Sequence, residues 1–105
     1  MKQIYFIINP KARNGYCLTV WKKVETKLMN DKIPYLAFFT EYHGHAIKLA
    51  AQIAARNHEQ KVIIAVGGDG TMHEVVNGIV EYNNITLGFV PGGSGNDFSR
   101  GFQIP

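Results

Sequence analysis

The sequence predicts an α/β fold in which a parallel sheet carries helices on both faces. Four short runs of apolar, β-branched and aromatic residues, at 4–8, 35–40, 62–66 and 86–90, alternate with stretches that have helical spacing. Continuous apolar runs are typical of strands that are buried on both sides, and parallel strands need helical crossovers between them. In such a fold the turn after the first strand and the two later glycine-rich loops lie at the carboxyl ends of the strands.

The first half of the chain predicts two strand-helix units in succession. After the strand at 4–8 and its Asn9-Pro10 stop, a first helix is indicated by apolar residues at four-residue spacing: Val20, Val24 and Leu28. The strand at 35–40 leads into a second helix, where apolar residues lie at i, i+3, i+4 and i+7: Ile47, Ala50, Ala51 and Ala54. Four large side chains of this half are expected to lie in the core: Tyr5, Phe6, Trp21 and Met29.

The second half repeats this unit, and each of its strands ends in a glycine-rich loop. The strand at 62–66 is followed by the loop 67–70 and then by apolar residues at helical spacing from Met72 to Ile79. The strand at 86–90 is followed by the second loop, 91–97. We therefore expect the chain to form four strands and at least three helices.

The composition excludes several classes of protein. With 46% hydrophobic and 18% charged residues, the chain is neither disordered nor fibrous, and we expect one domain over residues 1–105. The net charge of +3 comes from basic residues scattered along the chain, so no nucleic-acid partner is expected. The single cysteine, Cys17, and a start unlike a secretion leader favour a cytoplasmic location. Any membrane contact would be peripheral, because the apolar runs are too short to span a bilayer, and self-association into a homo-oligomer is left open.

The sequence Gly67-Gly68-Asp69-Gly70-Thr71 is the strongest indication of a binding site. Glycines allow a ligand to approach the backbone closely, and the helix that follows offers unpaired N–H groups and the positive end of its dipole. A phosphate group is the natural ligand of such a loop. The loop is not a P-loop, since no Gly-Lys-Ser/Thr follows, and it is not a dinucleotide-binding motif, since His73 stands where a third glycine would be needed.

An acidic side chain in a phosphate-binding loop needs an explanation, because a carboxylate repels phosphate. Asp69 is explained if it holds a bridging cation such as Mg²⁺ through water, or if it orients an acceptor hydroxyl group. In a purely structural interpretation, Thr71 and Glu74 form a capping box and the glycines serve only a tight turn. The two interpretations are compatible, but the capping box does not account for three glycines around an acid.

The residues around this loop carry a resemblance to a known family. The stretch from Val66 to Gly78, VGGDGTMHEVVNG, resembles the signature of the diacylglycerol kinase catalytic domain, which is shared with sphingosine and ceramide kinases. The stretch from Pro91 to Phe98, PGGSGNDF, resembles the family's second motif. Asn9-Pro10 resembles its opening loop, and the segment from Thr40 to Ala46 resembles its second-strand segment. The more distantly similar NAD kinases and phosphofructokinases share only the Gly-Gly-Asp-Gly core.

The resemblance implies an ATP site and the residues that form it. In the family, the first glycine loop and the following helical turn contact the ATP phosphates; here these residues are Gly67, Gly68, Asp69, Gly70, Thr71 and His73. Thr40 matches a residue on the adenine and ribose side of the nucleotide, and Asn9 would close the site. Ser94 matches a nucleotide-contacting position of the second motif, and its neighbours Gly95 and Asn96 are included in the site. The implied cofactors are ATP and Mg²⁺, with Asp69 as the catalytic candidate that holds the cation through water.

Two parts of these segments admit other interpretations. Lys11 and Arg13 stand where the family usually has small residues, and they either pair with phosphates or are simply solvated. Asn96 or Asp97 is equally suited to be the N-cap of a further helix from Phe98.

The function that follows is transfer of the ATP γ-phosphoryl group to the hydroxyl of a lipid acceptor such as diacylglycerol. Family members are much longer and have a second, mostly β domain with the acceptor pocket and the general base. Residues 1–105 are therefore expected to be the nucleotide-binding part of a lipid kinase and to be inactive alone. Two alternatives remain: a kinase of another acceptor, either a sphingoid base or NAD, and a nucleotide-binding regulatory module without catalysis.

Overall fold

The structure, a computed structural model, describes residues 2–91 as a layered α/β unit. Strands and helices alternate along the chain in the order β1 (Gln3–Ile8), α1 (Tyr16–Asn30), β2 (Leu36–Phe39), α2 (His45–Ala55), β3 (Lys61–Gly67), α3 (Asp69–Ile79) and β4 (Ile85–Pro91). Each strand boundary lies within one residue of the position that the sequence predicts. The alternation of buried runs and amphipathic stripes was therefore sufficient to locate the elements in this part of the chain.

The four strands form one parallel sheet in the order β2-β1-β3-β4. β1 and β3 lie in the middle, which explains their unbroken apolar runs: β3 is buried throughout, and β1 is buried after Gln3. β2 and β4 are the outer strands of the described sheet and are mostly half-buried or exposed. The predicted parallel α/β architecture is confirmed.

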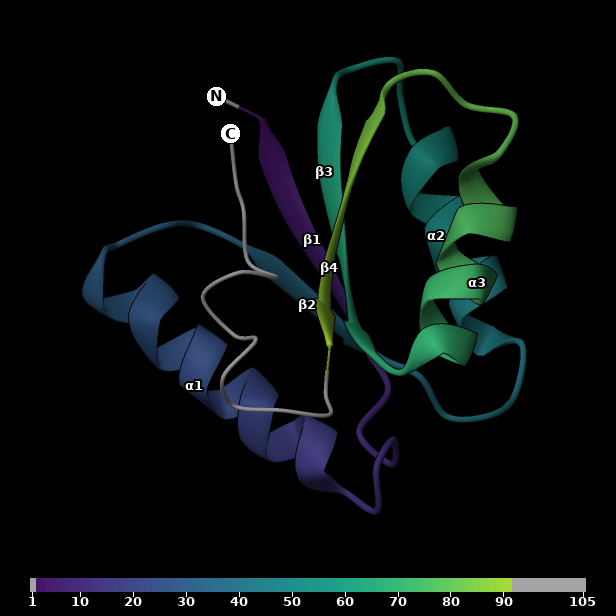
Figure 1. The fold of residues 1–105 in the computed structure, drawn as a ribbon. Helices are drawn as coiled ribbons and strands as arrows, with labels where there is room; N and C mark the ends of the chain where they lie inside the picture. Colours follow the sequence, from purple (N-terminus) through teal and green to yellow (C-terminus); the bar gives the residue numbers. More distant parts are fainter. Residues whose placement is uncertain (1, 92–105) are drawn as a thin grey trace.

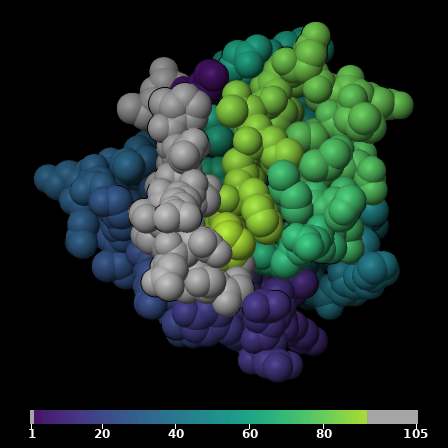
Figure 2. Space-filling view, in the orientation of Figure 1, coloured from purple at the N-terminus to yellow at the C-terminus, as the bar shows by residue number. Residues whose placement is uncertain are grey.

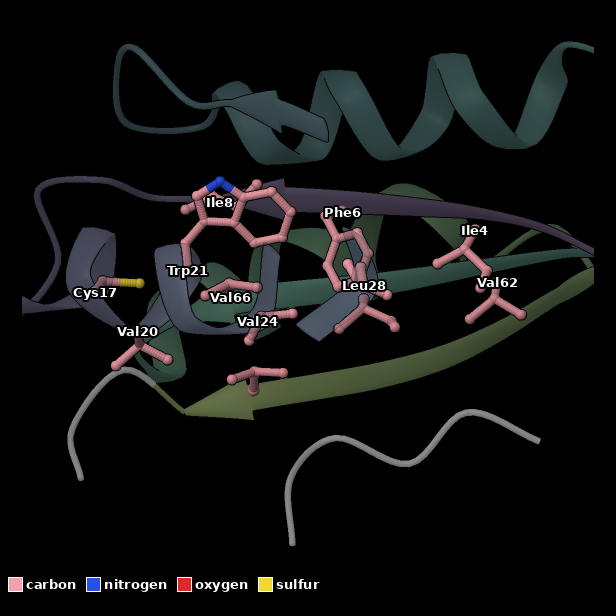
Figure 3. Packing of buried hydrophobic residues seen from close by; sticks show 12 residues of the cluster. Ile4, Phe6, Ile8, Cys17, Val20, Trp21, Val24, Leu28, Val62 and Val66 are labelled. Atoms are coloured by element: carbon pink, nitrogen blue, oxygen red, sulfur yellow. The ribbon is translucent and has the colours of Figure 1, made fainter. Parts of the chain in front are cut away.

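One face of the sheet is covered by α1. Its buried residues pack against the β1 and β3 side chains that point to this face, as Figure 3 shows, and Trp21 stacks at a tilt on Phe6 with ring centroids 4.9 Å apart. The expected core position of Met29 is wrong: its side chain is 65% exposed, because the buried stripe of α1 passes through its neighbour Leu28. Burial raises the pKa of the Cys17 thiol in this layer to about 11, which keeps it protonated and unreactive.

The opposite face is covered by α2 and α3, which lie side by side in Figure 1. The two helices lie close together at Gly78, where a Cβ atom would lie 2.5 Å from the carbonyl oxygen of Ile47 and 2.9 Å from the Cβ of Ala50. A side chain at Gly78 would push the helices apart, so packing alone explains this last residue of the first motif. Helices thus cover both faces, as predicted.

The carboxyl ends of all four strands lie at one edge of the sheet, the lower edge in Figure 1. The strand order changes direction between β1 and β3, and α1 and α2 leave the sheet on opposite faces. In open α/β sheets, ligands bind in the crevice that such a switch creates at the carboxyl ends of the strands. The topology therefore selects this edge as the place to look for a site.

Two predicted features come after Pro91 in the sequence. The helix expected from Phe98 lies outside the described residues, as does the second glycine loop after Pro91. Within residues 2–91, no helix combines the length and the apolar character that crossing a membrane requires.

Candidate functional site

A pocket of about 390 Å³ lies at the carboxyl edge, where the chain leaves β1, β2 and β3. Its volume falls in the range of small-molecule sites, about 300–1,000 Å³. Two loops and the first turns of α3 supply its lining: Asn9, Lys11, Thr40, Glu41, Tyr42, His43, Gly70, Thr71 and Glu74. Four residues that the sequence analysis placed in one site are thus brought together: Asn9, Thr40, Gly70 and Thr71. Figure 2 shows the loop after β1 beside the start of α3 at the lower edge.

Asn9 shapes the wall that follows β1. Its backbone N–H donates to the carbonyl oxygen of Val66 on β3 (2.9 Å), and its side-chain Oδ1 accepts from the N–H of Lys11 (3.2 Å). The chain then passes through left-handed backbone at residues 13–15, with φ of 57°, 57° and 89°. Non-glycine residues adopt this conformation at a cost, so the loop is held in a defined shape that puts Lys11 on the pocket.

The three glycines of the first loop have different reasons to be glycine. A Cβ atom on Gly67 would lie 2.5 Å from the Oγ1 atom of Thr71, so packing inside the domain requires this glycine. A Cβ atom on Gly68 or Gly70 would meet no atom within 4 Å. None of the three has a positive φ, so none of them needs to be glycine for the sake of its backbone conformation. The described fold does not require Gly68 or Gly70, and both leave the backbone at the start of α3 bare.

Within the described residues, no side chain caps the start of α3. Gly68 is the N-cap residue in extended conformation, and the first helical hydrogen bond runs from the N–H of Met72 to the carbonyl of Gly68 (3.2 Å). The alternative interpretation, a capping box, is wrong, because Thr71 lies inside the helix and the Glu74 carboxylate accepts a hydrogen bond from the loop after β2. The N–H groups of the first helical turn therefore have no side-chain acceptor among residues 2–91, and they lie at the positive end of the helix dipole.

Glu74 ties the loop after β2 to α3. Its Oε2 accepts a hydrogen bond from the backbone N–H of Gly44 (3.2 Å) and lies 3.6 Å from the Nδ1 of His43. Gly44 has φ of 90°, a left-handed conformation that favours glycine, and it is the N-cap residue of α2. The Glu74 side chain is only 18% exposed, so one carboxylate fixes the turn that carries the far wall of the pocket.

The far wall itself contains an aromatic ring. Tyr42 stacks on His45 with ring centroids 4.3 Å apart and planes inclined by 13°. The Nδ1 of His45 accepts from the backbone N–H of Glu41 (2.9 Å), which fixes the histidine ring and through it the tyrosine. Tyr42 lines the pocket, so the pocket has one flat apolar surface among polar groups.

The charges on the pocket are unequally distributed. Lys11 is the basic residue of its lining, while Glu41 and Glu74 are acidic. Asp69 and His73 are exposed residues of the first turns of α3 beside the pocket, and they are not among its lining residues. Gly67 and Gly68 likewise support the site from the end of β3 and do not line it.

The residues present fit a hydrated Mg²⁺ and do not form a metal cage. Among residues 2–91, no group of three or more metal-ligating side chains comes together. Asp69 is exposed at the start of α3, and its carboxylate has no ion pair or hydrogen bond within the described residues. Mg²⁺ commonly binds through one or two carboxylates, several waters and the phosphates of a substrate. A single carboxylate without a partner in the described residues, at the start of a helix, suits that mode.

The sequence interpretation and the described residues do not cover the same candidate site residues. Ser94, Gly95 and Asn96 lie outside the described residues. The sequence interpretation assigned no role to Tyr42 and gave Glu74 a helix-capping role, yet both line the pocket. Two signals pointed to them: Tyr42 follows the carboxyl end of a predicted strand, and Glu74 lies three residues after Thr71, on the same helical face.

The family model of the diacylglycerol kinase catalytic domain matches residues 3–105. This chain belongs to that family. It is 49% identical over 105 residues to "Putative lipid kinase YtlR" of Bacillus subtilis, covering 99% of this chain and 34% of the relative. It is 37% identical to a diacylglycerol kinase of Staphylococcus saprophyticus, again over 99% of this chain and 34% of the relative. The chain thus spans about a third of the length of these curated relatives.

Two more distant matches test how broad the family is. Sphingoid long chain base kinase 5 of Saccharomyces cerevisiae is 32% identical over 93% of this chain and 15% of the relative. The crystal structure of a diacylglycerol kinase from Bacillus anthracis superposes with a TM-score of 0.72 and 34% identity, covering 94% of this chain and 36% of that one. The predicted family is confirmed, and its members carry names with different lipid acceptors.

Proposed function

We propose that this chain is the nucleotide-binding part of an ATP-dependent lipid kinase that transfers the γ-phosphoryl group to a lipid hydroxyl. The observation that carries the proposal is the bare backbone at Gly68 and Gly70, which the described fold itself does not require. It lies at the uncapped start of α3, where N–H groups and the helix dipole attract an anion. Membership of the diacylglycerol kinase catalytic domain family supports a phosphorylated nucleotide as that anion.

Each wall of the pocket has a part in this proposal. The start of α3, with Thr71, receives the phosphates, and Lys11 offsets their charge from the loop after β1. Thr40 and Tyr42 receive the nucleoside on the loop after β2. Catalysis of phosphoryl transfer consists largely of positioning and charge stabilisation, so a fixed frame of this kind is what the reaction needs.

Asp69 has a proposed role in holding Mg²⁺ through water next to the phosphates. The cation neutralises charge on the phosphoryl group when it is bound, and Asp69 keeps it near the start of α3. In the longer enzyme that carries this domain, Asp69→Asn should lower turnover by about 10²-fold, the loss expected for one electrostatic stabiliser. Asp31→Asn, at the end of α1 where Asp31 pairs with Lys27 at 3.5 Å, is the matched control and should leave turnover unchanged. Unchanged turnover in Asp69→Asn would exclude the role.

The acceptor is proposed to be diacylglycerol, with the sphingoid bases as the alternative that the yeast relative's name favours. The acceptor pocket and the general base are proposed to lie in a second, β-rich domain outside this chain. The 105-residue chain should therefore bind ATP weakly and phosphorylate no lipid. Incubation of the chain with Mg²⁺, labelled ATP and vesicles containing diacylglycerol or a sphingoid base tests this directly. Lipid phosphorylation at an enzyme-like rate would contradict it, while absence of any nucleotide binding would contradict the proposed function as a whole.

A further inference from the structure

The loop that joins β2 to α2 carries the far wall of the pocket, and other elements anchor it at its two ends (Figure 1). At its start, the N–H of Thr40 donates to the carbonyl oxygen of Ile8 on β1 (2.8 Å). At its end, the N–H of Gly44 donates to the Glu74 carboxylate on α3 (3.2 Å). Neither of these hydrogen bonds involves the middle of the loop, where the aromatic ring of the pocket wall lies.

The middle of the loop is held by His45, the first residue of α2. Its Nδ1 accepts from the backbone N–H of Glu41 (2.9 Å), and its own backbone N–H donates to the carbonyl oxygen of Tyr42 (3.1 Å). Its ring also stacks on the ring of Tyr42, with centroids 4.3 Å apart. Among residues 2–91, no other side chain makes a hydrogen bond to Glu41 or Tyr42. The position of Tyr42 in the pocket wall therefore depends on the histidine ring.

The hydrogen bond to Glu41 requires a neutral histidine ring. An imidazole nitrogen accepts a hydrogen bond only while it carries no proton, so the ring proton of His45 is on Nε2. In the charged imidazolium both nitrogens carry protons. Protonation therefore places the Nδ1–H of His45 against the N–H of Glu41, two donors that cannot bond to each other. Histidine is the side chain that ordinarily makes this change between pH 5 and 8.

We propose that His45 is a positioning residue of the nucleotide pocket: its neutral ring holds Tyr42 in the pocket wall, and protonation of Nδ1 releases the middle of the loop. The proposal rests on the proposed function, because it assumes that a nucleotide binds against this wall. His45 is not among the described lining residues, so it acts on the ligand through Tyr42. A pocket whose wall is in place in only a fraction of the molecules binds its ligand more weakly by that fraction.

Other titratable groups lie near His45 on the loop, on α3 and on its own helix. They are Glu41, Tyr42, His43, Glu74 and Lys48. Of these residue types, histidine is the one that ordinarily titrates between pH 5 and 8. His43 responds in the opposite direction, because its Nδ1 lies 3.6 Å from the Oε2 of Glu74 and a positive charge there strengthens the attraction that holds the end of the loop. A loop that loosens at acidic pH is therefore the response expected of His45 and not of His43.

The test compares the unmodified chain with His45→Asn by calorimetric titration with ATP and Mg²⁺ at about pH 8 and about pH 5.5, on either side of the range in which histidine titrates. The Oδ1 of asparagine is as many bonds from the backbone as the Nδ1 of histidine, so the variant keeps the acceptor and does not titrate. Phosphate groups also titrate near pH 6, so the result is the difference between the two proteins. Between the higher and the lower pH, the affinity of the unmodified chain should fall about fivefold more than that of His45→Asn, as expected for the loss of one hydrogen bond.

The matched control is His58→Asn, which replaces an exposed histidine in the connection before β3 and should keep the pH response of the unmodified chain. Equal pH responses in the unmodified chain and in folded His45→Asn would overturn the inference without touching the proposed function. Absence of ATP binding at both pH values would overturn the proposed function itself.

A measurement without nucleotide keeps the role testable if thermal melting shows that His45→Asn is unfolded. The amide proton of Glu41, followed by NMR in the unmodified chain, should move upfield as its hydrogen bond is lost, in step with protonation of the His45 ring. An amide proton that does not follow the ring would contradict the role of His45.

Discussion

The two ends of the sheet differ in whether their polar groups have hydrogen-bond partners. At the amino end, Lys61 is only 2% exposed, and its Nζ donates to the carbonyl oxygens of Asn57 (2.9 Å) and Glu59 (3.3 Å). The Nδ2 of Asn84 donates to the same two oxygens, at 3.3 Å and 2.9 Å. This cluster closes on itself and joins the loop before β3 to the loop before β4.

The carboxyl end leaves equivalent groups open. Among residues 2–91, no side chain caps the start of α3, one oxygen of Glu74 has no partner, and a Cβ atom at Gly68 or Gly70 would meet no atom within 4 Å. A larger hollow, of about 670 Å³, exists at the amino end, but only exposed side chains line it: Lys2, Gln3, Pro34, Glu59 and Gln60. Volume therefore does not distinguish the functional end, whereas fixed polar groups without a partner do.

The sharpest test of this contrast replaces one lysine at each end. Lys61→Ala removes a buried side chain and two hydrogen bonds, so it should lower the free energy of unfolding by about 2–4 kcal/mol. Lys11→Ala removes an exposed side chain and should change stability by less than about 0.5 kcal/mol while weakening nucleotide binding. Urea denaturation and nucleotide titration of both variants check the pair. A stable Lys61→Ala, or a Lys11→Ala that binds ATP normally, would break the contrast.

The glycines of the first loop test the same contrast, between a residue that the fold needs and one that the ligand needs, over a stretch of five residues. Gly67→Ala forces a methyl group against Thr71 and should cost about 1–3 kcal/mol of stability, as overpacked sites do. Gly70→Ala meets no atom and lies in a helix, so it should gain up to about 1 kcal/mol and yet lose nucleotide affinity. Thermal unfolding and ATP titration measure both effects. If Gly70→Ala bound ATP as well as the unmodified chain, the bare backbone would have no role in binding.

The smallest expected effect is a pH dependence near the amino end of β2. Tyr35 donates to Oε2 of Glu25 (2.6 Å), and this hydrogen bond, followed by burial and the carboxylate charge, raises the pKa of Tyr35 from 10 to about 12. A raised pKa in the folded state means that the neutral phenol contributes stability below pH 10 and that this contribution is lost as the pH rises toward 12. Glu25→Gln should shift the phenol titration, followed by ultraviolet absorbance, to lower pH. An unchanged titration would show that Glu25 does not set this pKa.

The sequence was sufficient to predict the fold because each element is locally consistent. The runs in β1 and β3 are apolar because both strands are central, and the stripes of the helices match the faces that they bury. The prediction that Met29 is buried was wrong because Leu28, the residue before it, belongs to the buried stripe of the helix. A single apolar residue outside such a stripe does not indicate which way its side chain points.

The site was predicted in part for a similar reason. Asn9, Thr40, Gly70 and Thr71 belong to motifs at strand ends, where topology brings loops together. The role of Glu74 could not be read in the same way, because its partner Gly44 is 30 residues away and local spacing suggested a capping box instead. The packing of α2 on α3 decides that the Glu74 carboxylate meets Gly44, and the periodicity of the sequence does not predict this contact.

The most direct test of the central claim is a map of backbone amide shifts by NMR as ATP and Mg²⁺ are added to the chain. If the carboxyl end is the nucleotide site, the largest shifts within residues 2–91 should fall on three segments: 9–11, 40–44 and 68–74. The cluster around Lys61 and the hollow lined by Gln3 and Gln60 should stay unchanged. Shifts concentrated at that amino end, or no shifts at saturating ATP, would contradict the account.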